Sequence, residues 1–121
     1  MERMGAMPLI RLETDRISGS GNVEDLLEKM SATLAEAMGK PLEYVMATAS
    51  PCRISLGNRS GNAALVQIMS IGGLGQSVNG VLAASITELL AAELDLDPSR
   101  VYITLTDVPG ENWACGGSTF R

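Results

Sequence analysis

The chain contains no histidine, and this absence decides where catalytic chemistry has to be sought. Histidine is the usual general base near neutral pH, so its absence also removes the Ser-His and Cys-His nucleophile pairs and most zinc sites. The two cysteines, Cys52 and Cys115, lie far apart and form no CxxC pair. They predict neither a disulfide framework nor a redox dithiol, and they favour a reducing compartment such as the cytoplasm.

Pro8 is the residue whose chemistry could replace a histidine base. Inside a chain it is a proline that starts a strand, but at a chain terminus it would carry a secondary amine. Burial in an apolar pocket lowers the pKa of an amine because desolvation disfavours the charged form, so such a group can accept a proton near neutral pH. An initiator Met7 could be removed from before Pro8, whereas the bulky Glu2 protects Met1. We therefore expect residues 1–7 to be a leader that the functional form lacks, and residues 8–121 to be the domain.

The other polar candidates each have an ordinary structural interpretation. Residues 72–75 are glycine-rich and precede a helix, but the spacing of a dinucleotide loop is incomplete and no Gly-Lys-Ser/Thr follows, so a tight turn is favoured over a nucleotide site. Lys40 follows a helix-ending glycine, where a cation complements the helix dipole. Tyr44 and Tyr102 fit core positions with the hydroxyl at a rim. Cys115 has no histidine to activate it.

Composition restricts the class of protein. A chain of 121 residues with 45% hydrophobic and 19% charged residues is expected to form one globular domain. Its net charge of −5 and its four aromatic residues argue against nucleic acid and anionic lipid as partners. No apolar run approaches the roughly 18 residues that span a bilayer, and the N-terminus lacks the apolar core of a signal peptide. Membrane insertion is not expected, and any export would occur without a signal peptide.

Two helices and several strands have to position these residues. Apolar residues spaced by 3 and 4 predict a helix over residues 23–38, capped by Ser20 or Asn22 and ended by Gly39. A second helix stops before Pro98. Its apolar stripe consists of Val78, Val81, Leu82, Ile86, Leu89, Leu90 and Leu94. Strands are predicted at residues 8–14, 44–49, 53–56, 63–71 and 101–106, with a hairpin loop at 57–62.

The two halves of the chain resemble each other, because the strands at residues 8 and 63 and the helices at residues 23 and 78 are offset equally. The predicted fold is therefore α+β: a tandem βαβ repeat in which one four-stranded sheet carries both helices on the same face. The opposite face would be bare. Because Leu65, Ile68 and Leu105 are too apolar for a solvated surface, we expect other subunits to cover that face.

With these elements placed, the sequence resembles the macrophage migration inhibitory factor and D-dopachrome tautomerase family. The resemblance begins at Met7 and Pro8 and extends to Phe120 in the same order. Its motifs are GKPLEYV at residues 39–45, SIG at 70–72, PSRVYI at 98–103, Asp107, and GSTF at 117–120. Each motif is weak alone, but together they are specific.

The resemblance implies a homotrimer with active sites between subunits, and keto–enol tautomerisation of small aromatic α-keto acids such as phenylpyruvate, or of dopachrome-like compounds, without cofactor or metal. Carried over residue by residue, Pro8 is the base, Lys40 holds the substrate carboxylate, and Ser70 and Ile71 contact the substrate. Tyr102 reaches in from the neighbouring subunit. The residues implied to line the pocket are Tyr44 and Phe120.

The sequence departs from the family pattern at a few positions. Thr104 stands where the family often has asparagine, Cys115 stands where a pocket tryptophan is common, and the family's CxxC is absent, which argues against oxidoreductase activity. With Pro8 blocked by a preceding residue, a cytokine-like protein-binding role with vestigial catalysis, directed at a protein receptor, is the alternative. A nucleotide or phosphometabolite site at residues 72–75 is a third, weaker hypothesis.

Overall fold

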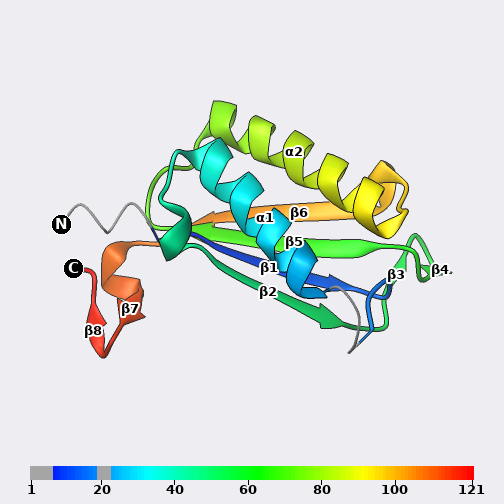
Figure 1. Ribbon diagram of the computed structural model, residues 1–121, viewed down its shortest axis with the longest axis horizontal. Helices are drawn as coiled ribbons and strands as arrows, with labels where there is room; N and C mark the ends of the chain where they lie inside the picture. Colours follow the sequence, from blue (N-terminus) through cyan, green and yellow to red (C-terminus); the bar gives the residue numbers. More distant parts are fainter. Residues whose placement is uncertain (1–6, 19–22) are drawn as a thin grey trace.

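The computed structural model describes residues 7–18 and 23–121. A four-stranded sheet in the order β2-β1-β5-β6 forms one layer. Its strands are β1 Leu9–Thr14, β2 Met46–Pro51, β5 Ala64–Ser70 and β6 Val101–Asp107. Within each half the strands are parallel, and the two halves meet where β1 and β5 pair antiparallel. Helices α1 Val23–Met38 and α2 Gln76–Leu94 lie together on one face of the sheet (Figure 1). The predicted α+β tandem repeat is confirmed.

The core lies between the helices and this face of the sheet. Each helix buries residues four positions apart, Leu26, Met30 and Leu34 in α1 and Leu82, Ile86 and Leu90 in α2. That spacing places them on one stripe of the helix, which is why the sequence pattern located both helices. Burying each such side chain contributes about 1.5–3 kcal/mol.

The helix ends agree with the sequence signals. Gly39, with φ of 65°, follows α1 in the left-handed conformation that glycine adopts without a steric penalty. Helix α2 ends at Leu94 and is followed by a left-handed cap residue, Asp95, before a 3-10 helix at Pro98–Arg100. The predicted cap residues Ser20 and Asn22 lie outside the described residues. Val81, assigned to the apolar stripe of α2, is 51% exposed and does not belong to the buried face.

Helix α2 has the length and composition of a helix that could cross a membrane, a test that core helices of soluble proteins also pass. In this fold its Leu82, Ile86 and Leu90 are fully buried. They belong to the hydrophobic core formed with the strands. This packing explains why these three positions of the helix are apolar.

Some strand boundaries differ from the prediction. Tyr44 belongs to a 3-10 helix, Leu42–Tyr44, and β2 begins only at Met46. The predicted strand at 53–56 is reduced to β3 Ser55–Leu56, which pairs with β4 Arg59–Ser60 as a short hairpin. The tail folds into a 3-10 helix, Gly110–Asn112, and a second hairpin of β7 Ala114–Cys115 and β8 Ser118–Thr119. Such short elements have too few residues to show a period.

The uncovered face of the sheet is more polar than expected. Ile68 is fully buried in the core and Leu105 packs against it, so both face the helices, and the expectation that they lie on the bare face was wrong. Side chains alternate along a strand, so Leu65, Gln67 and Met69 face the other way. The register aligns the open face in three rows. The central row is Thr48, Arg11, Gln67 and Thr104, and the outer rows are Met46, Leu9, Met69, Thr106 and Ser50, Glu13, Leu65, Tyr102.

Candidate functional site

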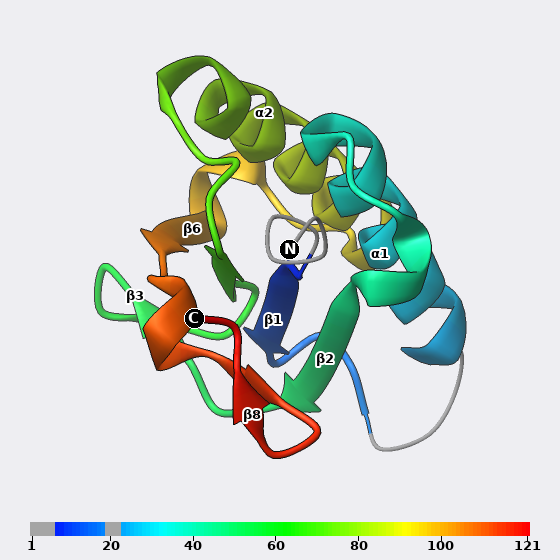
Figure 2. The same ribbon diagram turned by 90° about the vertical axis from the view of Figure 1, so that its left-hand side faces the viewer.

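One edge of the sheet brings together the beginnings of β1 and β2 with the ends of β5 and β6. The antiparallel pairing of β1 with β5 places Pro8 beside Ser70, and the parallel pairing of β5 with β6 adds Asp107. Pro8 is fully buried, and its carbonyl accepts a hydrogen bond from Met46 N at 3.1 Å. Figure 2 shows this edge facing the viewer, with the C-terminal segment in front of it.

Lys40 reaches this edge from the end of α1. Its backbone N–H donates to Ala35 O at 3.0 Å, directly after the left-handed turn at Gly39. Its side chain passes close to Gly73, since a Cβ at that glycine would lie 3.1 Å from Lys40 Cε and 3.4 Å from Lys40 Nζ. The half-buried ammonium therefore lies beside the loop that follows β5.

Hydrogen bonds hold the loop that carries Ile71. Ser70 Oγ, buried, donates to Gly72 O at 2.6 Å, and Asp107 Oδ1 accepts from Gly72 N at 2.8 Å. Val108 N donates to Ser70 O at 2.8 Å. Ile71 is thus fixed between bonded neighbours. Asp107 was not predicted as a site residue. Its bond to a residue 35 positions away has no local sequence signal.

Tyr44, Cys115, Phe120 and Met7 line a pocket of about 210 Å³ at the same edge. Phe120 N donates to Gly110 O at 3.1 Å and to Trp113 O at 3.0 Å, so the tail is folded back. The pocket walls are two aromatic rings and two sulfur-containing side chains, which form a largely apolar lining. Met7 occupies the place next to Pro8, and the Pro8 nitrogen is part of the amide that joins them.

Tyr102 lies at the other end of the sheet. It is 59% exposed and pairs with Leu65 near the beginning of β6, whereas Asp107 ends that strand at the edge of Pro8. It contributes to a separate pocket of about 230 Å³. The other lining residues are Ile54, Ser55, Leu56, Ala63, Ala64 and Leu65. Of the predicted site residues, one chain brings together Pro8, Lys40, Tyr44, Ser70, Ile71 and Phe120, but not Tyr102.

The glycine-rich loop at residues 72–75 is arranged as a packed turn. Gly72 N is bonded to Asp107, and Gly75 N donates to Asn79 Oδ1 at 3.2 Å. Two amide donors that a phosphate would need are therefore engaged. The close approach of Lys40 to Gly73 adds a steric reason for glycine. Both observations favour the tight-turn interpretation over a nucleotide site.

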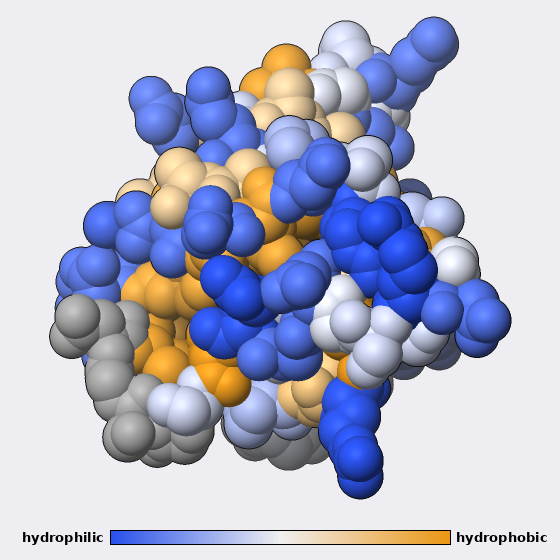
Figure 3. Space-filling view, turned by 90° about the vertical axis from the view of Figure 1, so that its right-hand side faces the viewer, coloured by the Kyte–Doolittle hydropathy of each residue, from blue (hydrophilic) through white to orange (hydrophobic). Residues whose placement is uncertain are grey.

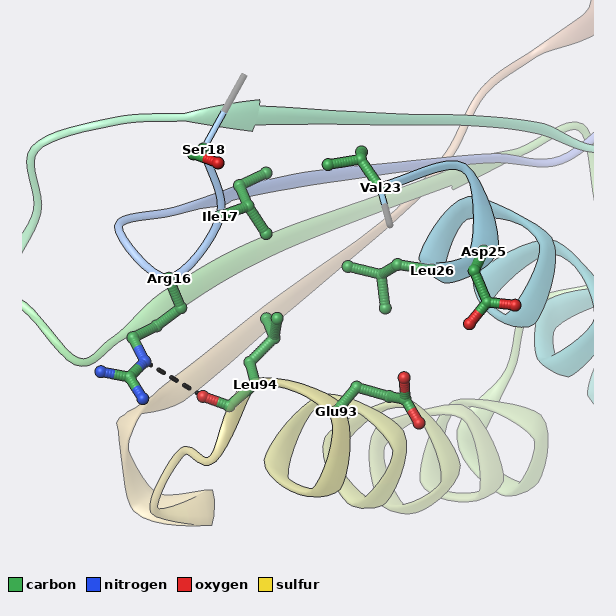
Figure 4. A pocket seen from close by; sticks show the side chains of 8 residues that line it. All are labelled: Arg16, Ile17, Ser18, Val23, Asp25, Leu26, Glu93 and Leu94. Atoms are coloured by element: carbon green, nitrogen blue, oxygen red, sulfur yellow. Dashed lines mark hydrogen bonds between the residues drawn. The ribbon is translucent and has the colours of Figure 1, made fainter. Parts of the chain in front are cut away.

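A larger hollow of about 310 Å³ opens at the opposite end of the molecule, between the beginning of α1 and the end of α2. Figure 3 shows hydrophobic surface among hydrophilic side chains at this end. Its charged groups already have partners. Arg16 Nε donates to Leu94 O at 3.0 Å (Figure 4), and Asp25 and Glu93 both pair with Lys29. These bonds join the two helices to each other and to the end of β1. The charged groups of the hollow therefore have a structural role.

Thiols and carboxylates form no further reactive cluster in the described part of the chain. No group of three or more His, Cys, Asp or Glu in residues 7–18 and 23–121 is arranged to hold a metal ion. Both cysteines are free thiols. Burial raises the pKa of Cys52, and the carboxylates of Glu13 and Asp15 raise it further, so the thiol form is favoured over the nucleophilic thiolate.

Comparison with known proteins finds relatives along nearly the whole chain. The family model described as macrophage migration inhibitory factor matches residues 7–121. The macrophage migration inhibitory factor of Meriones unguiculatus is 32% identical over 115 residues, which are 94% of this chain and 99% of that protein. Solved structures from Toxoplasma gondii (29% identity, TM-score 0.85) and Prochlorococcus marinus (28%, TM-score 0.88) each cover 93% of this chain and 99% of their own.

Proposed function

Because the chain belongs to the macrophage migration inhibitory factor family, we propose that it is a cofactor-free keto–enol tautomerase of the phenylpyruvate or dopachrome type. Pro8, as a free N-terminal amine, is the general base. The observation that carries the proposal is the convergence at one sheet edge of the buried Pro8 with Lys40 and with the pocket lined by Tyr44 and Phe120.

The reaction needs only groups that this edge offers. An aryl α-keto acid is an anion, so the Lys40 ammonium would bind its carboxylate by a charge-assisted hydrogen bond. The Pro8 amine removes a proton from the carbon next to the carbonyl, and the electron pair moves into the enol double bond. The protonated Pro8 amine then delivers a proton to the carbonyl oxygen and returns to its neutral form. Burial keeps such an amine able to accept a proton near neutral pH.

This chemistry requires that no residue precede Pro8. While Met7 is attached, the Pro8 nitrogen is an amide without a basic lone pair, and the Met7 side chain takes up part of the pocket wall. We therefore propose that residues 1–7 are absent from the active form and that residues 8–121 are the tautomerase domain. Of this leader only Met7 is among the described residues.

The direct test compares two chains, one that begins at Pro8 and the 121-residue chain, in an assay of phenylpyruvate tautomerisation. Activity in the shorter chain alone supports a proline base. A Pro8→Gly variant of the shorter chain keeps an N-terminal amine but not a secondary one, and it should lose most of the rate. Equal activity of the two chains, or no activity in either, contradicts the proposal.

The site is completed between copies in this proposal. Tyr102 lies at the end of the sheet away from the Pro8 edge of its own chain and is exposed, which supports its entry into the pocket of a neighbour in a homotrimer. Thr104 lies two residues after Tyr102 in β6 and is therefore on the same open face of the sheet. Free Cys52 and Cys115 support a reducing, cytoplasmic location.

A protein-binding role is the second candidate function. It is favoured by the amide at Pro8, which prevents proton abstraction in the 121-residue chain. In this case binding of a receptor would be independent of the amine. A receptor pull-down that gives the same yield with the wild-type chain and the Pro8→Gly variant would support binding without catalysis, and a loss of binding in the variant would argue against it.

A further inference from the structure

Arg100 is a buried cation that is paired with backbone carbonyls. It is 7% exposed, and within residues 7–18 and 23–121 none of the ion pairs involves it. Its guanidinium donates four hydrogen bonds of 2.8–3.2 Å, all to one segment. The acceptors are the carbonyl oxygens of Leu56, Arg59, Gly61 and Asn62. Burying a charge is costly, and the rigid fork of five N–H groups makes arginine suited to hold several acceptors at once.

The segment that Arg100 holds has little stability of its own. The β3–β4 hairpin has only two residue pairs, and four of the residues from 57 to 62 adopt positive φ. They are Gly57, Asn58, Gly61 and Asn62. Two-stranded hairpins of this size are marginal in water. Side chains from elsewhere therefore hold it: Asp15 accepts from the N–H groups of Asn62 and Ala63, and Arg100 binds the carbonyls.

The same arginine is joined to Tyr102. Arg100 ends the 3-10 helix Pro98–Arg100, where its N–H donates to Asp97 O at 2.8 Å, and β6 begins at the next residue. Tyr102 is the second residue of β6 and shares the 230 Å³ pocket with Ile54 and Leu56 of the hairpin region. Arg100 thus connects the two walls of this pocket.

On the basis of the proposed function, in which Tyr102 enters a neighbour's pocket, we infer that Arg100 is a positioning residue for the active site of the neighbouring copy. It holds segment 56–62 against the beginning of β6, so that Tyr102 is presented in one orientation. Its effect is therefore exerted on the Pro8 of another chain, although Arg100 itself touches no substrate.

Complementation in mixed oligomers tests this directly. All chains begin at Pro8. The Arg100→Lys variant keeps the charge but has one donor group in place of a fork, so its homo-oligomer should lose at least tenfold in kcat/KM. Co-assembly with Pro8→Gly chains, which lack the base but keep Arg100, should raise the rate per Pro8 severalfold, because a normal Tyr102 then enters the sites of the variant.

The matched control is co-assembly of the Arg100→Lys chain with the Pro8→Gly/Arg100→Lys double variant, which should give no recovery. The inference is overturned if both mixtures behave alike, or if the Arg100→Lys homo-oligomer has the wild-type rate. An inactive wild-type chain beginning at Pro8 would instead refute the proposed function, and it would do so in the same assay.

A measurement without catalysis tests the structural premise of the inference, that Arg100 holds segment 56–62 against the beginning of β6, in that case and also if the variant assembles poorly. Hydrogen exchange in Arg100→Lys should become at least tenfold faster at the amides of residues 55–62 and near Tyr102, with protection in β1 and β5 unchanged. In ultracentrifugation, the variant oligomer should also begin to dissociate at a higher protein concentration than the wild-type oligomer does. Unchanged exchange and unchanged assembly overturn the inference, and so does loss of protection throughout the sheet, since that is general unfolding.

Discussion

At the scale of single residues, two neighbouring glycines, Gly39 and Gly73, determine where the Lys40 side chain lies. Lys40 follows the left-handed turn at Gly39, and its side chain passes so close to Gly73 that a Cβ there would lie 3.1 Å from Lys40 Cε. We expect Lys40→Ala in the chain beginning at Pro8 to raise KM for phenylpyruvate by about tenfold or more, because a charge-assisted bond to the carboxylate is lost. Steady-state kinetics measures this, with Lys40→Arg as the variant that keeps the charge. An unchanged KM would remove Lys40 from carboxylate binding.

Gly73 provides a steric test of the same geometry. Its φ is 80°, and an added methyl group would lie 3.1 Å from Lys40 Cε and 3.2 Å from Met38 Cε. We expect Gly73→Ala to displace the Lys40 side chain and to raise KM severalfold. Gly117→Ala is the matched control, since Gly117 has a φ of 89° but no neighbour within 4 Å of the new carbon. If both variants change KM equally, backbone strain and not contact with Lys40 is the cause.

At the scale of elements, Asp15 joins the end of β1 to the beginning of β5. Burial raises the pKa of its carboxyl group, but the hydrogen bonds from Asn62 and Ala63 outweigh this effect, and the net pKa is lowered. A lowered pKa in the folded state stabilises the fold above the unfolded-state pKa, and the stabilisation is lost as pH falls through the folded-state value.

The melting temperature of the wild-type chain should therefore fall below about pH 4, and the fall should be shallower in Asp15→Asn. Circular dichroism melts between pH 2 and pH 6 measure both curves. Glu28→Gln, an exposed change on α1, should keep the wild-type dependence. An Asp15→Asn curve parallel to the wild-type curve would show that Asp15 does not contribute to acid sensitivity.

At the scale of the whole molecule, a substitution on the uncovered sheet face should change the association of copies without changing the fold of one chain. Leu65 faces away from the helices, beside Glu13 and Tyr102 on neighbouring strands. A new carboxylate at this position stays hydrated in a single copy but would be buried without a partner between copies. We expect Leu65→Glu to shift a trimer toward a monomer without loss of secondary structure.

Analytical ultracentrifugation gives the mass, and far-ultraviolet circular dichroism gives the secondary structure. Ala83→Glu, on the exposed face of α2, is the control and should leave the mass unchanged. A Leu65→Glu chain with the wild-type mass would place the contact between copies elsewhere than on this face.

Predictions from local sequence signals were accurate, whereas those that depended on contacts between distant residues were less so. The stripe of Leu82, Ile86 and Leu90 and the turn at Gly39 are local, and both elements lie where they were expected. The strand at Tyr44 was placed two residues early because a short 3-10 helix has no distinguishing period. The faces of Ile68 and Leu105 were assigned wrongly, since apolarity alone does not reveal which side of a strand the helices cover.

The sequence by itself determined the helices, the doubled strand–helix–strand order and the family to which the chain belongs, because apolar periodicity and short motifs are properties of neighbouring residues. Only the tertiary structure decided that Asp107 bonds to Gly72, that Arg100 holds a hairpin some 40 residues earlier, and that Tyr102 lies away from Pro8. These relations depend on strand order and register, which bring distant residues together, and a hydrogen bond between such residues leaves no pattern in the local sequence.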